Sequence, residues 1–262
     1  MDVLRKELTL FFIAMGFFTR IPMPTWVKVD GDSLNKANRY FGLVGVLVGA
    51  LSALIYALSI QVLPVSVSIL LAMMISVALT GAFHEDGLAD TADGFGGGWK
   101  IADKLKIMKD SRIGTYGAVT LLLALFLKFQ LLMELALYDP EMLVPALIIG
   151  HCLSRVLAAS IIFTDTYVSD AYVSEEKGSK SKPLAQNQTI NELLILLVTG
   201  GLALWLSGLT STILIAASLF LLRWLLVSLF RRQIGGYTGD TLGAAQQVSE
   251  LVCYLVLLAA IA

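Results

Sequence analysis

The sequence predicts an all-α protein, a polytopic transmembrane helical bundle with about seven spans and an N-terminal helix that is interfacial or re-entrant. Of its 262 residues, 57% are hydrophobic and 15% are charged, whereas a soluble domain carries about 25% charged residues. The hydrophobic residues also form long runs, and about 20 apolar residues are enough to cross a bilayer. Because lipid offers the backbone no hydrogen-bond partners, each span is expected to be an α-helix.

The individual elements follow from these runs. An apolar stretch at Leu8–Phe18 is too short to span, and no small-residue cleavage site follows it, so we expect an interfacial or re-entrant helix there. With no internal repeat or domain boundary, residues 1–262 are predicted to form a single integral-membrane domain. The predicted spans are Phe41–Leu63, Val65–Phe83, Thr115–Leu137, Met142–Phe163, the shorter Glu192–Leu206, Leu209–Phe230 and the short Val248–Ala262.

The cationic residues predict the orientation. Sixteen of the nineteen Lys and Arg residues lie in four long segments, and the turns at Pro64, Asp139 and Ser207 carry none. Cytoplasmic loops are enriched in Lys and Arg, so all four long segments are predicted to face the cytoplasm. This layout favours an enzyme with cytosolic substrates over a transporter, which needs both faces. The net charge of −1 and the lack of a basic tract argue against a nucleic-acid partner. The four segments are Met1–Tyr40, His84–Gly114, Thr164–Asn191 and Arg231–Gln247.

An acidic segment follows the second span, with Glu85, Asp86, Asp90 and Asp93 inside nine residues. If the span continued as a helix, the three aspartates would share one face at its C-terminal end, where the macrodipole disfavours anions. Such an arrangement is costly without a cation, and Mg²⁺ prefers carboxylate and phosphate oxygens. We therefore predict a divalent-metal site. The alternative is a solvated acidic loop, but the glycine run at 96–98 favours an anionic ligand close to the backbone.

Basic residues precede the third span. Lys109, Ser111 and Arg112 offer phosphate donors, and Arg binds phosphate in bidentate fashion. Gly114 and Gly117 flank the predicted helix start, where free amides attract anions. The alternative is that these cations only flank a membrane span, as we expect for Lys104 and Lys106.

Arg155 lies inside the fourth span, where an Arg costs about 2.5–3.5 kcal/mol on insertion scales. It is expected either to face the acidic site or a bound phosphate, or to form a structural ion pair, for example with Glu134. Two further segments complete the predicted cytoplasmic face. Arg20 lies in T-R-I-P at 19–22, and Asp240 lies in a glycine-rich segment, where it could supplement the metal site or hold a substrate hydroxyl.

Together these motifs resemble the cobalamin synthase family, also called adenosylcobinamide-GDP ribazoletransferase. The resemblance extends from the N-terminal motif to the last span. The long acidic motif is its most specific part. The matching motifs are T-R-I-P at 19–22, F-H-E-D-G-L-A-D-T-A-D-G-F-G-G-G at 83–98, K-D-S-R-I-G-T-Y-G at 109–117 and G-G-Y-T-G-D-T-L-G-A at 235–244.

The resemblance implies a magnesium-dependent transferase in the bacterial cytoplasmic (inner) membrane. Adenosylcobinamide-GDP and α-ribazole, or its 5′-phosphate, would give adenosylcobalamin, or its 5′-phosphate, and GMP. Glu85, Asp86, Asp90 and Asp93 are then expected to hold Mg²⁺, with Asp93 the predicted general base and Asp90 also catalytic. The expected partners are these small molecules and the lipid bilayer. A homo-oligomer is compatible with the sequence. The predicted substrate-binding residues are Arg20, Lys109, Ser111, Arg112, Arg155 and Asp240.

Two alternative functions stay open at this point. The acidic motif is more loosely similar to that of the CDP-alcohol phosphotransferases, although their D-G-x-x-A-R opening is absent. The other alternative is a cation-coupled membrane transporter. A transporter is expected to place its acidic site near the middle of the membrane, whereas these carboxylates follow the end of a span.

Overall fold

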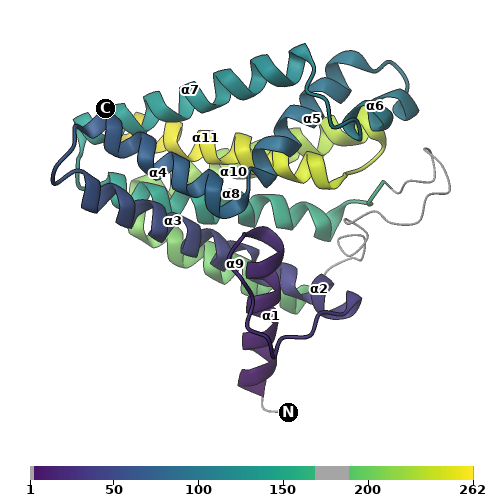
Figure 1. Ribbon diagram of the computed structural model, residues 1–262, viewed down its shortest axis with the longest axis horizontal. Coiled ribbons are helices and arrows are strands. Elements are labelled where there is room, and N and C mark those ends of the chain that lie inside the picture. Colours follow the sequence, from purple (N-terminus) through teal and green to yellow (C-terminus); the bar gives the residue numbers. More distant parts are fainter. Residues whose placement is uncertain (1–2, 169–188, 262) are drawn as a thin grey trace.

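The protein is a bundle of long helices with a shorter helix standing crosswise to it (Figure 1). The computed structural model describes residues 3–168 and 189–261, and within them the only β-structure is one bridge between Tyr167 and Tyr237. The predicted all-α bundle is confirmed. The helices are α1 (Val3–Phe18), α2 (Gly31–Ala37), η1 (Asn38–Tyr40), α3 (Phe41–Ser59), α4 (Val65–Thr80), α5 (Phe83–Gly97), α6 (Ile101–Met108), α7 (Thr115–Tyr138), α8 (Leu143–Thr164), α9 (Ile190–Leu204), η4 (Trp205–Ser207), α10 (Leu209–Ile234) and α11 (Gly239–Ile261).

Six helical segments among the described residues are long and apolar enough to cross a membrane. The bent pair α4 and α5 raises the number to seven if it counts as one span. The protein is therefore a multi-pass membrane protein. The six segments are Gly31–Ser59, Thr115–Tyr138, Leu143–Thr164, Ile190–Ser207, Leu209–Ile234 and Gly239–Ile261.

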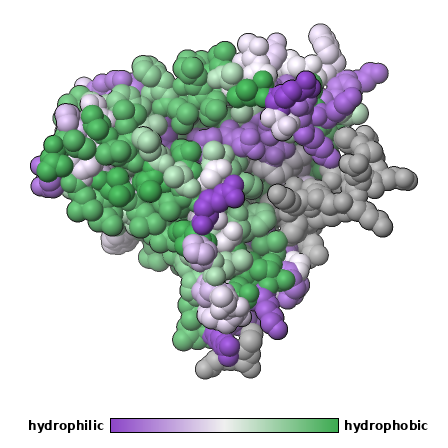
Figure 2. Space-filling model, in the orientation of Figure 1, coloured by the Kyte–Doolittle hydropathy of each residue, from purple (hydrophilic) through white to green (hydrophobic). Residues whose placement is uncertain are grey.

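The two ends of the bundle differ. The tight α3–α4 and α7–α8 turns and the C-terminus lie at the left of Figure 1, whereas α5 and α6 lie at the right. Side chains between these ends form a largely hydrophobic surface, and hydrophilic residues gather near α5 and α6 and on α1 (Figure 2). The positions of these two turns agree with the short turns predicted at Pro64 and Asp139.

The predicted second span is wrong at its C-terminal end. Instead of continuing into the acidic segment, α4 ends at Thr80 and the chain bends by 84° before α5. Two consecutive residues, Gly81 and Ala82, adopt left-handed backbone conformations, with φ of 64° and 58°. For Ala82 this conformation costs on the order of 1–3 kcal/mol. A hydropathy pattern does not report such a bend, because the apolar run passes through it.

The start of the last span also differs from the prediction. The last span begins at Gly239 rather than Val248, because Thr238 and Thr241 cap α11. The Thr238 amide donates to Thr241 Oγ1 at 2.8 Å, and the Thr241 amide donates to Thr238 Oγ1 at 3.3 Å. Hydropathy did not indicate this helix start, because the first turns of α11 contain several polar residues. The short N-terminal stretch is a helix, as predicted, and its crosswise direction in Figure 1 agrees with the interfacial prediction.

Helix α8 is the centre of the bundle, and 83% of its apolar 18-residue stretch is buried inside the protein. Helix α3 packs closely against α8. The approach is close at Gly49, where an added Cβ would lie 2.7 Å from the Leu147 carbonyl oxygen. Small residues of this kind let membrane helices approach at backbone distance. Helices α5, α7 and α11 contact one another beside this core, and α5 and α11 carry the acidic residues of the candidate site.

Candidate active site

The bend gives the acidic segment a helix of its own. Glu85 and Asp86 lie in the first turn of α5, not at the C-terminus of a continuous span as the sequence suggested. A carboxylate near a helix N-terminus is stabilised by the macrodipole, so the cost expected from the dipole is removed. The predicted common face of Asp86, Asp90 and Asp93 is kept, because the spacings of four and three residues fall within one helix.

Asp240 joins this acidic face from a distant part of the sequence. It lies in the first turn of α11, and α11 approaches α5 so closely that a Cβ on Gly87 would lie 2.8 Å from the Asp240 carbonyl oxygen. The negative charges of Asp240, Asp86 and Asp93 all act on half-buried Asp90. The prediction that Asp240 supplements the acidic site is therefore supported by its position.

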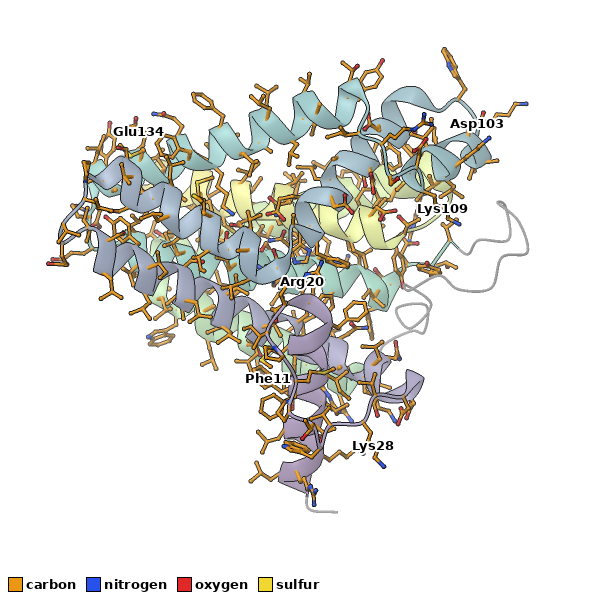
Figure 3. All side chains as sticks on the ribbon, viewed as in Figure 1. Phe11, Arg20, Lys28, Asp103, Lys109 and Glu134 are labelled. Atoms are coloured by element: carbon orange, nitrogen blue, oxygen red, sulfur yellow. The ribbon has the colours of Figure 1, made fainter. Side chains whose placement is uncertain are left out.

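A cavity of about 550 Å³ opens beside this face. Its lining includes Asp86, Asp240 and Arg20. The Arg20 backbone amide donates to the Leu79 carbonyl oxygen at 2.6 Å, which fastens the T-R-I-P segment to the end of α4. The labelled Arg20 side chain lies where α1 meets the bundle (Figure 3). First turns of two helices, two carboxylates and a guanidinium thus meet at one cavity, which offers oxygen ligands to a cation and a donor to an anion.

Asp93 has a different environment. It is buried, and its two oxygens accept hydrogen bonds from the backbone amides of Gly114 at 2.7 Å and Gly117 at 2.8 Å. These amides belong to the start of α7, where no earlier turn of helix supplies acceptors. Asp93 therefore ties α5 to α7, a structural task that the predicted roles of base and metal ligand did not include.

Replacing Asp93 by Ala is expected to lower the free energy of unfolding by about 1–2 kcal/mol, as for the loss of other helix N-caps. Equilibrium unfolding of the purified protein in mixed micelles measures this change. Asp90→Ala is the matched control and is expected to stay within about 0.5 kcal/mol, since no cap depends on it. Equal stability of the two variants would contradict the capping role.

Of the predicted basic residues, Arg112 lies at a second cavity of about 500 Å³, which Asp93, Asp110 and Tyr116 also help to line. Arg112 is exposed and its guanidinium pairs with Asp110, with Arg112 Nη2 2.6 Å from Asp110 Oδ2. Hydrogen bonds from Arg112 lower the pKa of Asp110 to about 2. An exposed pair of this kind contributes little to stability, so Arg112 can exchange its partner for a phosphate.

The other two predicted phosphate donors share this loop. Ser111 is exposed. The positive charge of Lys109 acts on Asp240, and Figure 3 labels Lys109 at the α5–α6 end of the molecule. Lys109 thus lies within electrostatic range of Asp240 but does not line the first cavity, whereas Arg112 lines the second.

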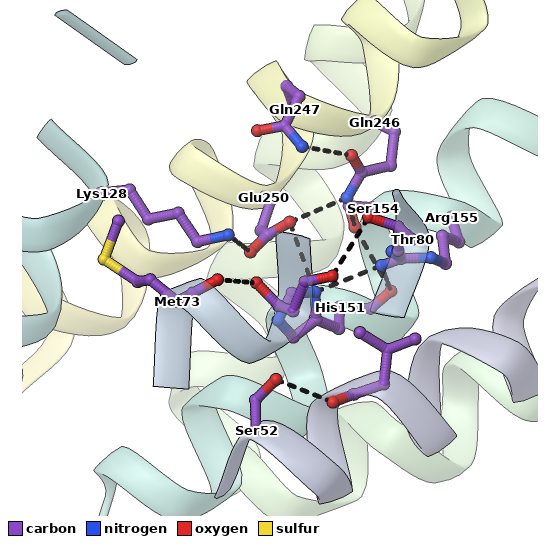
Figure 4. Close-up of polar contacts among 12 residues, drawn as sticks. Ser52, Met73, Thr80, Lys128, His151, Ser154, Arg155, Gln246, Gln247 and Glu250 are labelled. Carbon is purple, nitrogen blue, oxygen red and sulfur yellow. Dashed lines mark hydrogen bonds and ion pairs between the residues drawn. The ribbon is translucent and has the colours of Figure 1, made fainter. Parts of the chain in front are cut away.

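Glu85 and Arg155 belong to neither cavity lining. Both lie in a buried polar network between α5, α7, α8 and α11, part of which Figure 4 shows. Glu85 Oε1 accepts from Gln247 Nε2 at 3.0 Å. Arg155 Nη1 donates to the His151 carbonyl oxygen at 2.8 Å. For Arg155 the structural alternative fits better, but its partner is not Glu134, which instead accepts from Gln130.

Glu250 is the centre of this network and was missed by the sequence reasoning. Its carboxylate lies 2.5 Å from Lys128 Nζ and accepts from Tyr254 Oη at 3.0 Å and Gln246 Nε2 at 2.8 Å. Both Glu250 and Lys128 are almost completely buried. The sequence did indicate a polar cluster here, because three polar residues lie close together in the N-terminal half of the last helix. They are Gln246, Gln247 and Glu250.

The residues present fit a magnesium ion that is completed by substrate. Among the described residues, no group of three His, Cys, Asp or Glu side chains is arranged to hold a metal by itself. Mg²⁺, however, is usually bound by one or two carboxylates together with substrate phosphates and water. Asp86 and Asp240 supply two carboxylates on one cavity, which matches that donor set.

Comparison with known proteins decides the family. The sequence pattern described as cobalamin-5-phosphate synthase matches residues 10–258. This chain belongs to that family. It is 69% identical over 258 residues to the adenosylcobinamide-GDP ribazoletransferase of Shewanella woodyi (strain ATCC 51908 / MS32), and 63% identical over 258 residues to that of Shewanella pealeana (strain ATCC 700345 / ANG-SQ1). Each alignment covers 98% of both chains. No solved structure matches the chain.

Proposed function

We propose that this protein transfers the adenosylcobinamide phosphate group of adenosylcobinamide-GDP to α-ribazole or its 5′-phosphate. The products are adenosylcobalamin or its 5′-phosphate, and GMP. Relatives that match almost the whole chain are named for this reaction. The structural observation that carries it is the meeting of Asp86, Asp240 and Arg20 at one cavity beside two helix N-termini.

The reaction joins an acceptor hydroxyl oxygen to the phosphorus that bears cobinamide. The bond from this phosphorus to the GMP oxygen breaks, and the hydroxyl proton must leave. Phosphoryl transfer depends mainly on positioning and on stabilising negative charge. Arg20 and Lys109 would hold the diphosphate, and Arg112, released from Asp110, would neutralise GMP. A role for Ser111 as a further phosphate donor stays a prediction.

Asp90 is our candidate for the base that accepts the hydroxyl proton. It lies between Asp86 and Asp93 on the same face, and three neighbouring carboxylates surround it with negative charge. Asp93 is less suited to this role, because both its oxygens already accept backbone amides. A role for Glu85 or Arg155 in binding metal or phosphate stays a prediction, and their buried contacts support a structural role instead.

Magnesium dependence is part of the proposal. A bound Mg²⁺ would stabilise the negative charge that develops on the diphosphate oxygens. Asp86 and Asp240 would hold it, with Asp90 close by. The remaining predictions concern location: we propose the bacterial inner membrane, with the α5–α6 end of the bundle facing the cytoplasm, in agreement with the distribution of Lys and Arg.

The position of the acidic residues argues against the transporter alternative. A transporter is expected to bind its coupling ion near the middle of the membrane. Here α5 lies at one end of the bundle (Figure 1). The charged groups inside the bundle are engaged with one another, as the Lys128–Glu250 pair shows.

The decisive experiment is the release of GMP by purified protein in detergent. We expect turnover with adenosylcobinamide-GDP and α-ribazole 5′-phosphate, its loss with excess EDTA and its recovery with added Mg²⁺. A CDP-alcohol with a lipid acceptor serves as the control substrate pair. Release of CMP from that pair without release of GMP from the first would overturn the proposal.

A further inference from the structure

We propose that the cavity of about 550 Å³ is the binding site for the acceptor nucleoside α-ribazole, with its base against Phe17 and Phe83 and its sugar toward Asp86 and Asp240. This inference rests on the proposed function and adds which of the two nucleosides occupies which place. It concerns one wall of the cavity that the metal and phosphate chemistry does not use.

Two aromatic side chains form that wall. Phe17, at the end of α1, and Phe83, the first residue of α5, both line the cavity. Their ring centroids lie 6.1 Å apart with an interplanar angle of 73°. Phe83 keeps 41% of its surface exposed although it is large and apolar. An exposed aromatic side chain beside a cavity is a surface on which a flat heterocycle can stack.

The backbone conformation immediately before Phe83 is energetically unfavourable. Gly81 and Ala82 are consecutive left-handed residues immediately before it, and Ala82 is the one such residue other than glycine in the described part of the chain. Strained backbone of this kind is concentrated at ligand-binding and active sites. The bend directs α5 away from α4 and brings Phe83 and Asp86 to the same cavity.

The chemistry of the two bases decides between the nucleosides. The base of α-ribazole is a methylated benzimidazole. It has no N–H donor, and its single hydrogen-bond acceptor is one ring nitrogen at the edge, so its two faces are suited to apolar contacts. Guanine has N–H donors that would stay unpaired against phenylalanine rings, which is unfavourable in a partly buried site. Of the side chains of this cavity that can accept hydrogen bonds, Asp86 and Asp240 are required at the diphosphate. The hydroxyls of Thr19 and Thr80 are already engaged with backbone groups.

The dimensions agree with a nucleoside. Pockets for small ligands typically measure about 300–1,000 Å³, and this cavity measures about 550 Å³. A corrin ring with its side chains has several times as many atoms as a nucleoside, so it must stay outside. Binding α-ribazole here would place its sugar hydroxyls beside Asp86, where the attack on phosphorus is proposed.

The test compares KM for each of the two substrates of the purified enzyme. We expect Phe83→Ala and Phe17→Ala to raise KM for α-ribazole 5′-phosphate about 5-fold or more, with KM for adenosylcobinamide-GDP unchanged. Phe83→Leu keeps an apolar side chain and should give a smaller rise. Tyr116→Leu removes an aromatic side chain from the second cavity and should leave KM for α-ribazole 5′-phosphate unchanged.

Binding is also measured without turnover, by titrating the protein with α-ribazole and following benzimidazole fluorescence. A loss of affinity in the two Ala variants, with unfolding temperatures like that of the wild type, supports the site. Unchanged affinity, or a rise in KM for adenosylcobinamide-GDP instead, overturns it while GMP release by the wild type keeps the proposed function. Wild-type protein that neither binds α-ribazole nor releases GMP overturns both.

Discussion

Replacing Asp86 or Asp90 by Asn is expected to lower the rate of GMP release by about 10²–10³-fold, the size of effect seen when one electrostatic group is removed from an active site. Asn keeps the shape of the side chain but removes its charge. Asp86 is exposed to the cavity and Asp90 is half-buried between other carboxylates. Neither side chain is needed to hold the helices together, so the loss should be confined to catalysis.

The free energy of unfolding of these variants provides a second test of the prediction. Like charges on one helix face repel, so removing one should leave the free energy of unfolding unchanged or raise it. Asp103→Asn is the matched control, because Asp103 is an exposed carboxylate on the neighbouring helix α6 (Figure 3). Activity within tenfold of wild type in the Asp86 or Asp90 variant would contradict the assigned roles.

Glu250→Gln is expected to lower the free energy of unfolding by about 3–5 kcal/mol, because it leaves buried cations without their counter-charge. Glu250 contacts Lys128 at 2.5 Å, and its charge also acts on Arg155. Lys128 and Arg155 both lie in candidate membrane spans, where an unpaired cation is costly. Equilibrium unfolding in mixed micelles measures the loss.

The Lys128→Met variant tests whether Glu250 is the centre of the network. It should destabilise the protein less than Glu250→Gln does, since the carboxylate keeps hydrogen bonds from Tyr254 and Gln246. Glu134→Gln is the control on the same helix as Lys128 and should change stability by about 0.5 kcal/mol or less. A larger loss for Lys128→Met than for Glu250→Gln would show that the network is organised differently.

The bend before α5 illustrates what a sequence pattern leaves out. Hydropathy places a span over Val65–Phe83, and the run is indeed apolar throughout. The left-handed residues Gly81 and Ala82 lie beside the segment that follows α1, whose Arg20 amide donates to the Leu79 carbonyl oxygen. Gly81 is the residue type that commonly ends a helix, but hydropathy does not show the direction in which the chain continues after Ala82.

The different environments of the acidic residues could not be predicted from the sequence either. Helical spacing correctly grouped Asp86, Asp90 and Asp93 on one face. The same spacing does not show that Asp93 would be occupied by the amides of Gly114 and Gly117, because those amides come from another helix. Glu85, adjacent to Asp86, points instead to Gln247.

The class of fold, the separation of short turns from long loops, and the acidic and basic motifs could all be predicted from the sequence. These features depend on composition and on spacing within one segment. The meeting of Asp240 and Arg20 with Asp86 at one cavity, and the place of Glu85 and Arg155 in a buried network, become visible in the folded protein alone. Such groupings depend on how separate helices approach one another, and this follows from packing and backbone bends rather than from the order of residues.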